Sequence, residues 1–501
     1  MPRVSRRRRF GVDSSHSHYK WWALSCTSLG MLMATVNSGT LIIALPDLER
    51  SLHTSILSLV WVILAYMIAA TVLVLTAGRL SDLFGRKRAY VSGFAIFTFA
   101  SLGAGFAANG TQLILWRVLQ GIGAALLFAN ASALVTDAFP TGELGRAMGT
   151  NVMIAAIGLV LGPVLGGVLV SISWHWVFWF NVPLGVVGTL WAALVLRELA
   201  HRDAVVGYDF LGTMLYVVGL TGLTLGVSKG GLTGWDDPVV LIGLAAGAIL
   251  LPLWVLVELR SRAPMLDMTL FKDRLFAAAT AASFINGMSR FALMFLFVFY
   301  FQGAQGDDPI TAGIKITPMA VGMLIASPIA GWWADTHGSR TLAAWGMFLG
   351  AVGLAGMTTL QVDSPYWQST LWLFVVGVAS GMFNSPNTAA MMSAVPANRR
   401  GVAAGARTML QNTGAVLSIA LVMAIVTSAV PQNVLIAIFS GVSKGVTDAR
   451  LEPFIHNLHV AMWVLAAISL VGAGVSLLRP KRVAGDVAVE VDAEPVIVRA
   501  A

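Results

Sequence analysis

A charged turn that occurs twice in an almost continuously apolar chain constrains the fold more than any other feature. Residues 78–88 read GRLSDLFGRKR, and residues 331–340, 253 positions later, read GWWADTHGSR. Both turns have the pattern Gly-x-x-x-Asp-x-x-Gly followed by a basic residue, and both lie between long hydrophobic segments. This repetition predicts a membrane protein that is built from two similar halves.

The composition excludes a water-soluble fold. Only 11% of the 501 residues are charged and 57% are hydrophobic, whereas an average soluble domain is about 25% charged. A bilayer core of about 30 Å needs about 20 apolar residues for each helix, so we expect an all-α polytopic membrane protein with fourteen transmembrane helices. The expected spans are 21–45, 57–79, 88–108, 112–136, 147–170, 175–198, 208–228, 238–258, 274–301, 311–333, 342–362, 369–394, 404–429 and 457–478.

The distribution of Lys and Arg predicts the orientation. When both termini are placed in the cytoplasm, most basic residues fall on the cytoplasmic side, and only Arg50, Lys229, Lys444 and Arg450 fall outside. If the number of spans differed by one, half of the loops would change sides and this bias would be lost. The basic run at residues 6–9 precedes the first span, where it fixes topology and contacts anionic lipid, so the net charge of +8 does not indicate nucleic acid. We expect a multi-pass protein of the bacterial cytoplasmic (inner) membrane.

A second alignment supports the repeat and predicts the domain organisation. Residues 118–149 match residues 375–405 at a constant offset of 256, with three glycines and one proline in register. The single cysteine, Cys26, excludes an intramolecular disulfide and a Cys-rich metal or redox site, and we expect no cofactor and no metal. The expected parts are a basic cytoplasmic tail at 1–20, a six-helix bundle at 21–198, a linker with two extra helices at 199–273, a second six-helix bundle at 274–478, and a disordered cytoplasmic tail at 479–501.

Three motifs resemble those of the major facilitator superfamily, and specifically its fourteen-helix branch of drug:proton antiporters, over about residues 20–480. GRLSDLFGRKR matches the loop motif after helix two, LILWRVLQGIGAA at 113–125 matches the fourth-helix motif, and GLVLGPVLGG at 158–167 matches the fifth-helix motif typical of exporters. The resemblance implies two pseudo-symmetric six-helix bundles that export amphipathic small molecules, such as drugs or metabolites, by proton-coupled alternating access. We expect a monomer surrounded by membrane lipid.

One position departs from the family pattern. The first helix of such antiporters usually carries an aspartate shortly before an apolar-Ala-Leu-Pro ending, and Asn37 stands at that point. An asparagine cannot titrate, so coupling through this position is in doubt. No acid lies in the middle of an expected span, so a proton carrier would be a helix-end residue such as Asp137 or Glu258, or would involve Arg117 indirectly.

The repeated turns are candidates for a latch. Arg86 and its basic neighbours can pair with acids at nearby helix ends, of which Asp137 is the natural partner. The resemblance implies that this cluster holds the two halves together when the cytoplasmic side is closed; the alternative is that these residues only set topology. The expected latch residues are Gly78, Asp82, Gly85, Arg86, Arg88, Asp137, Asp335, Gly338 and Arg340.

Two further groups lie inside the spans of the first half. A charge such as Arg117 is costly within a membrane helix, and the resemblance implies that Arg117 and Gln120 take part in coupling; the alternative is that they only fix helix packing. Small residues in the fifth helix allow close helix contact, which a leak-proof seal and ordinary packing both require. The residues of this export motif are Gly158, Gly162, Pro163, Gly166 and Gly167.

Polar residues in the other spans are candidates for a substrate cavity, or for hydrogen bonds between helices. Arg290 and Arg407 would attract anions if they faced such a cavity, so we expect a substrate that is neutral and amphipathic, or anionic. The expected cavity residues are Asn37, Asn286, Arg290, Asn384, Arg407 and Gln411.

Other classes of function lack their sequence signals. The chain has no G-x-x-x-x-G-K-[ST] phosphate loop, which argues against a primary pump. It has no H-E-x-x-H helix and no cluster of histidines or paired acids, so we expect no enzyme. No loop is long enough for the soluble domain of a receptor. Within transporters, the alternative is an exporter of a lipid or an anionic metabolite that is not coupled through the usual first-helix acid.

Overall fold

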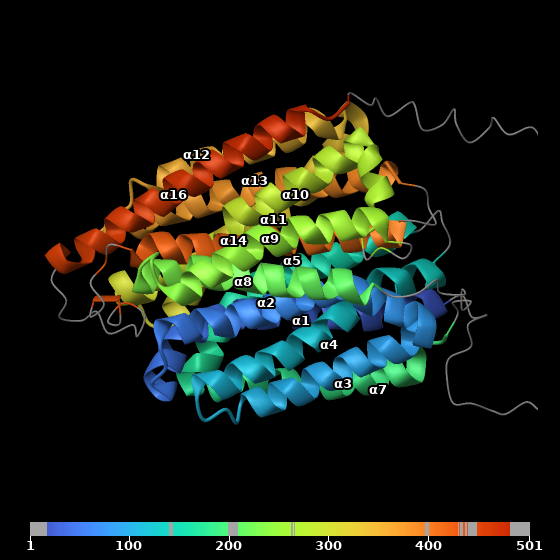
Figure 1. The fold of residues 1–501 in the computed structure, drawn as a ribbon, viewed down its shortest axis with the longest axis horizontal. Helices are drawn as coiled ribbons and strands as arrows, with labels where there is room; N and C mark the ends of the chain where they lie inside the picture. The colour runs from blue at the N-terminus through green and yellow to red at the C-terminus, as the bar shows by residue number, and fades with distance from the viewer. Residues whose placement is uncertain are drawn as a thin grey trace, which may run out of the picture.

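The computed structural model describes residues 18–139, 144–198, 209–261, 264, 266–395, 400–428, 430, 434–435, 438 and 448–480. Every regular element in this part of the chain is a helix (Figure 1). The elements are α1 (Tyr19–Leu52), α2 (Ile56–Phe84), α3 (Arg86–Ala104), α4 (Gly110–Ala138), α5 (Leu144–Ile172), α6 (His175–Trp179), α7 (Asn181–Val195), α8 (Phe210–Thr233), α9 (Pro238–Arg260), η2 (Met268–Lys272), α10 (Arg274–Val298), η3 (Phe299–Ala304), α11 (Pro309–His337), α12 (Ser339–Met357), α13 (Tyr366–Ser393), α14 (Arg400–Thr427) and α16 (Asp448–Leu477).

A long helix lies at each of the fourteen predicted spans when α6 is taken with α7 and η3 with α10. Eleven of these segments are long and apolar enough to cross a membrane, as judged from the described residues. The other three are α3, α5 and α13, which are helices of 19, 29 and 28 residues. The all-helical membrane fold is therefore confirmed, whereas the number of fourteen spans stays a prediction. The last helix begins at Asp448, nine residues before its predicted start.

The helices form two bundles with the same internal packing. In the first bundle α1 packs on α5, α2 on α4, and α3 on α4 and α7. In the second bundle α10 packs on α14, α11 on α13, and α12 on α13 and α16. Each of these four contacts of the first bundle thus has a counterpart in the second, as the repeat predicts. Figure 1 shows the blue and teal helices on one side of the molecule and the orange and red helices on the other.

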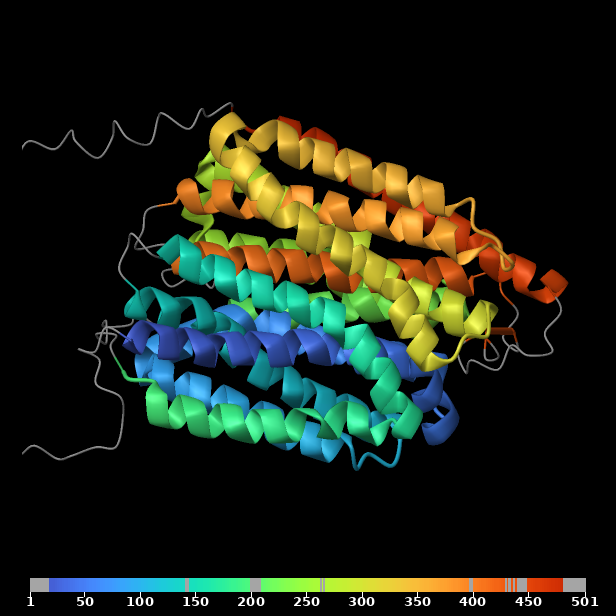
Figure 2. The same cartoon turned by 180° about the vertical axis from the view of Figure 1, so that it is seen from behind.

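Two seams join the bundles. On one face α5 packs against α11, which Figure 2 shows as teal and yellow ribbons side by side. On the other face α2 packs against α14, and the extra pair α8 and α9 lies there (Figure 1). Helix α8 contacts both α14 and α2, and the hydroxyls of Tyr216 and Thr413 form a hydrogen bond between α8 and α14. The extra pair therefore touches both bundles.

The two charged turns have the same backbone geometry. Gly85 ends α2 and begins α3 with φ +103°, and Gly338 ends α11 and begins α12 with φ +84°. Residues with a side chain rarely adopt positive φ, whereas glycine does so at little cost. The last glycine of each Gly-x-x-x-Asp-x-x-Gly pattern is therefore required by the turn itself. We call the end of the molecule that carries these turns the turn end, and the other end the opposite end.

Candidate functional site

The turn between α2 and α3 is held by two acids. Nη1 of Arg86 lies 2.6 Å from Oδ1 of Asp137 in the last turn of α4, so the predicted ion pair forms. The backbone N–H groups of Arg86 and Lys87 donate to the carboxylate of Glu198 at 2.8 and 3.2 Å. A carboxylate is favoured at a helix N-terminus because unpaired N–H groups and the positive end of the helix dipole lie there. A Cβ at Gly85 would overlap the Glu198 carboxylate, which is a second reason why this position requires glycine.

These contacts all lie within the first bundle, since they join α3 to α4 and to the segment after α7. Arg88 is exposed, while Gly78, Gly338 and Arg340 are half-buried. The side chains of Asp82 and Asp335 lie outside the described part of the structure. Glu198 was not among the predicted latch residues, although it is an acid at the end of the predicted span 175–198.

A buried polar network surrounds Arg117 on α4. Its Nε donates to the carbonyl of Val62 at 2.9 Å, its Nη1 donates to Oε1 of Gln120, and its guanidinium lies 4.2 Å from the ring centroid of Tyr66. Val62 and Tyr66 on α2 and Gln120 on α4 are all uncharged. The arginine is only 1% exposed. Its charge is therefore stabilised by a carbonyl, an amide and an aromatic face, with no carboxylate among its described contacts.

Gln120 extends this network to α1, α3 and the α7 region. Its Nε2 donates to Ser101 Oγ at 2.7 Å and to Asn37 Oδ1 at 3.2 Å, and Nδ2 of Asn181 also donates to Asn37 Oδ1, at 3.3 Å. The Nδ2 of Asn37 has no hydrogen-bond partner in the described part of the chain, although the residue is fully buried. Asn37 thus accepts two hydrogen bonds in the way that a carboxylate would, but it cannot take up a proton. No motif in the sequence pointed to Ser101 or Asn181.

The export-motif glycines of α5 lie on two faces. Gly158, Gly162 and Gly166 contact α1, where added Cβ atoms would meet Thr35, Gly39 and Thr40. A Cβ at Gly167 would instead lie 2.5 Å from the carbonyl oxygen of Pro309 and 2.7 Å from Cα of Ile310, in α11 of the second bundle. The carbonyl of Pro163 also faces α11, at Gly313. The motif therefore makes close contacts on two faces of α5, one inside the first bundle and one across the seam.

The two bundles are closed against one another at the opposite end. Gln302 lies in η3, a π-helical continuation of α10, and its Nε2 donates to the carbonyl of Ile43 on α1 at 3.1 Å. The Gly167 and Gly313 contacts lie in the same half of α5 and α11. Helical turns of the π type often occur at functional positions, and here the side chain of Gln302 reaches the other bundle.

The predicted cavity residues of the second half are occupied with contacts inside their own bundle. Nη1 of Arg290 donates to Ser380 Oγ at 2.7 Å and its Nη2 donates to the carbonyl of Gly346 at 2.8 Å, so the guanidinium is held by α13 and α12. Nδ2 of Asn286 lies 3.3 Å from the sulfur of Met347 on α12. The guanidinium of Arg290 is thus engaged within the second bundle.

The remaining predicted cavity residues of the second half are less fully bonded. Nε of Arg407 on α14 and Oδ1 of Asn384 on α13 have no hydrogen-bond partner in the described part of the chain. The backbone of Gln411 packs against Gly287 of α10. Arg479, which follows α16 at the predicted start of the tail, is 1% exposed and donates to Asn387. No group of His, Cys, Asp and Glu within the described residues is arranged to hold a metal ion.

The comparisons with known proteins decide the family. The model of the Major Facilitator Superfamily matches residues 27–419 and 279–496. The chain belongs to this superfamily. It is a multi-pass membrane transporter rather than an enzyme, and the resemblance found in its motifs is confirmed.

Several bacterial relatives of this major facilitator are named for resistance or transport. A multidrug resistance protein of Mycobacterium tuberculosis is 32% identical over 79% of this chain and 74% of its own length. A tetracenomycin C resistance and export protein of Streptomyces glaucescens is 28% identical over 82% of this chain and 76% of its own length. A riboflavin transporter of Clostridioides difficile is 28% identical over 90% and 96%.

A solved structure supports the fold. A bacterial homologue of the human lysosomal transporter Spinster, in an inward-facing and unoccupied conformation, superposes with a TM-score of 0.61 over 93% of this chain and 98% of its own. The sequence identity is 15%, so this similarity concerns the fold alone.

Proposed function

We propose that this major facilitator exports amphipathic small molecules across a bacterial cytoplasmic membrane by alternating access, with residues 21–198 and 274–478 as the two moving halves and 199–273 as the linker. The observation that carries the proposal is the closed contact at the opposite end, where Gln302 bonds to Ile43 and α5 touches α11 through Gly167. A transporter that rocks must open and close such a contact. The resistance and export relatives support the direction.

The orientation follows the distribution of basic residues, so the turn end is placed in the cytoplasm. In this orientation the opposite end faces outward and the closed contact corresponds to a state in which substrate does not leave. The ion pair between Arg86 and Asp137 joins α3 to α4 within the first bundle, so its proposed part in the latch is to fix the shape of the turn rather than to bridge the two halves.

The proposed driving force is the proton gradient, with Asp137 at the turn end as the proton carrier. The network around Arg117 and Asn37 has only neutral partners among its described contacts. Asp137 is a carboxylate in direct contact with a cation, so protonation of Asp137 removes the charge that holds Arg86. This assigns to Asp137 the role that an acid at position 37 plays in similar antiporters, and leaves Arg117 to stabilise the packing around it.

Transport by purified protein in liposomes tests this proposal. A pH gradient is imposed across vesicles that contain wild-type protein or Asp137→Asn, and uptake of matched cationic, neutral and anionic amphiphiles is followed. Proton-driven uptake by wild type and its loss in Asp137→Asn are expected. Gradient-driven uptake that persists at the wild-type rate in this variant would assign coupling elsewhere, and no uptake of any amphiphile would reject the substrate class.

A second candidate function is export of a lipid or an anionic metabolite. It is favoured by Arg407, a half-buried cation on α14 whose Nε has no hydrogen-bond partner in the described part of the chain. Ligand-dependent thermal stability separates the two candidates, since binding to the folded state raises stability by about 2.7 kcal/mol at a hundredfold excess over Kd. Stabilisation by anionic amphiphiles alone, lost in Arg407→Gln, supports the second candidate; stabilisation by cationic amphiphiles contradicts it.

A further inference from the structure

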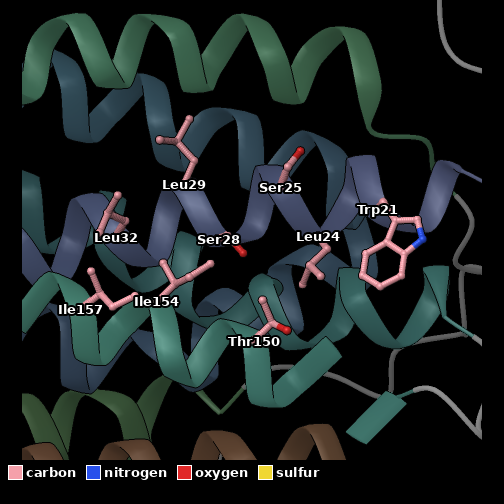
Figure 3. Close-up of a pocket in the computed structure, with 9 residues that line it drawn as sticks. All are labelled: Trp21, Leu24, Ser25, Ser28, Leu29, Leu32, Thr150, Ile154 and Ile157. Carbon is pink, nitrogen blue, oxygen red and sulfur yellow. The ribbon is translucent and has the colours of Figure 1, made fainter. Parts of the chain in front are cut away.

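A groove on the outer side of the first bundle is not explained by transport. Figure 3 shows the residues that line it, between the teal α5 and the green α7 and in front of the blue α1. Its volume is about 480 Å³, within the range of about 300–1,000 Å³ that is usual for ligand pockets. Helix α1 packs against both α5 and α7, whereas α5 and α7 make no extensive contact with each other in the described part of the chain. The groove therefore lies over α1, at the place where α5 and α7 diverge from one another.

The wall of the groove is apolar over the length of about three helical turns. Leu24, Leu29 and Leu32 line it from α1, and Ile154 and Ile157 line it from α5. In a membrane protein such a surface faces hydrocarbon. A hydrocarbon chain is the ligand that this wall fits, because it needs no hydrogen bonds.

The serines of the groove already have partners in the protein. Oγ of Ser28 donates to Oδ1 of Asn151 at 2.9 Å. Oγ of Ser25 donates to the carbonyl of Trp22 at 2.8 Å and accepts from Nε1 of Trp191 at 3.1 Å. These bonds leave no demand for a polar ligand group at this depth, which argues against a drug-like substrate with polar substituents.

The groove ends at the turn end beside a basic and aromatic cluster. The indole of Trp21 closes it beyond Leu24 (Figure 3), and Nζ of Lys20 lies 5.9 Å from the ring centroids of both Trp21 and Phe139. The backbone N–H of Arg197, just past α7, donates to the hydroxyl of Tyr19 at 3.1 Å, which places a second basic residue next to the start of α1. Tryptophan and lysine at this position are typical of the membrane interface.

Two acids at this end of the first bundle have partners of their own. Asp137 is paired with Arg86, and Glu198 accepts hydrogen bonds from the N-terminus of α3. We propose that the groove holds an acyl chain of one anionic glycerophospholipid, with the lipid phosphate at Lys20. Hydrocarbon tails are all as apolar as leucine side chains, so the wall of the groove accepts an acyl chain without selecting one lipid over another. The charge of the headgroup therefore decides which lipid stays bound.

Native mass spectrometry of the full-length protein after delipidation in detergent tests this site. Dioleoylphosphatidylglycerol and dioleoylphosphatidylcholine are added separately, and bound lipid is counted. We expect one tightly retained phosphatidylglycerol in wild type and its loss in Ile154→Trp, which fills the groove. The matched control is Leu190→Trp on α7, whose side chain is 58% exposed outside the lining of the groove; this variant should keep the lipid.

A charge variant tests the headgroup. Lys20→Gln should lower the preference for phosphatidylglycerol over phosphatidylcholine about five-fold, since one basic residue near an anionic lipid contributes about 1 kcal/mol. Equal retention of phosphatidylglycerol by Ile154→Trp and wild type would refute the groove, and Leu29→Trp provides the same test from α1 if Ile154→Trp does not fold. Equal retention of the two lipids by wild type would refute the anionic headgroup. None of these readouts depends on transport, so they stand apart from the proposed export.

Discussion

The contact between α5 and α11 makes a quantitative prediction about the conformational equilibrium. A Cβ at Gly167 would lie 2.5 Å from the carbonyl oxygen of Pro309 and 2.7 Å from Cα of Ile310, whereas ordinary contacts of a Cβ are 3.4–4 Å. In Gly167→Ala the two helices must therefore separate by about 1 Å, or the closed contact is lost. Overpacking of this kind costs about 1–3 kcal/mol. Because only the state with the opposite end closed has this contact, the ratio of closed to open molecules should fall about 5- to 150-fold.

Double electron–electron resonance, which gives the distribution of distances between two spin labels, measures this ratio directly. Spin labels are attached at His53→Cys, between α1 and α2, and at Asp363→Cys, between α12 and α13, in a Cys26→Ala background. Both native side chains are exposed and both loops lie at the opposite end. We expect the Gly167→Ala variant to shift the distribution toward longer distances.

Two controls separate the seam from general effects of alanine. Gly474→Ala, on α16, adds a Cβ with nothing within 4 Å, so it should leave the distances unchanged and can even favour the helix by up to about 1 kcal/mol. Gly166→Ala overlaps Thr40 of α1 within the first bundle, so it should lower the melting temperature without a specific shift between the bundles. Identical distance distributions in wild type and Gly167→Ala would refute the seam as the closing contact.

Three further variants test the turn and the buried network. Asp137→Asn should reduce transport strongly but lower stability by only about 1 kcal/mol or less, because the pair with Arg86 is partly exposed; an unfolded variant in size-exclusion chromatography would contradict this. Gln120→Leu leaves buried partners unsatisfied and should cost about 1–3 kcal/mol, seen as a lower melting temperature; an unchanged value would mean that the network is not formed. Gly85→Ala combines a φ of +103° with overlap of Glu198, so its melting temperature should fall, and partial recovery in Gly85→Ala with Glu198→Ala would show the overlap.

Much of the fold was predictable because hydropathy and internal repetition act over whole helices. The ion pair of Arg86 with Asp137 followed from opposite charges at neighbouring helix ends, and the contact of Arg117 with Gln120 followed from their spacing of three residues on one helix face. The separation of the α5 glycines could also have been expected, since Gly167 is rotated by about 100° from Gly166 on a helix with 3.6 residues per turn.

The partners contributed by distant helices could not be predicted. Glu198 is 112 residues from Arg86, and Ser380 is 90 residues from Arg290. Their contacts depend on how helices rotate about their own axes when they pack, and an apolar span gives little information on rotation because both lipid and neighbouring helices accept the same side chains. Polar residues in spans were therefore found readily, but the direction in which each one points was not.

The position of the extra helix pair makes the two seams unequal toward the membrane. Helix α8 bonds to α14 through Tyr216, touches α2, and packs its Gly231 against Ala424, so one seam is screened from lipid by α8 and its companion α9. The seam between α5 and α11 has no such cover among the described helices. Among the described helices, one seam therefore meets the bilayer through α5 and α11 themselves, and the other seam meets it through the extra pair. If hydrophobic molecules enter from within the bilayer, the α5–α11 face is the one that this arrangement would favour, and a neighbouring protein docked there would compete with them.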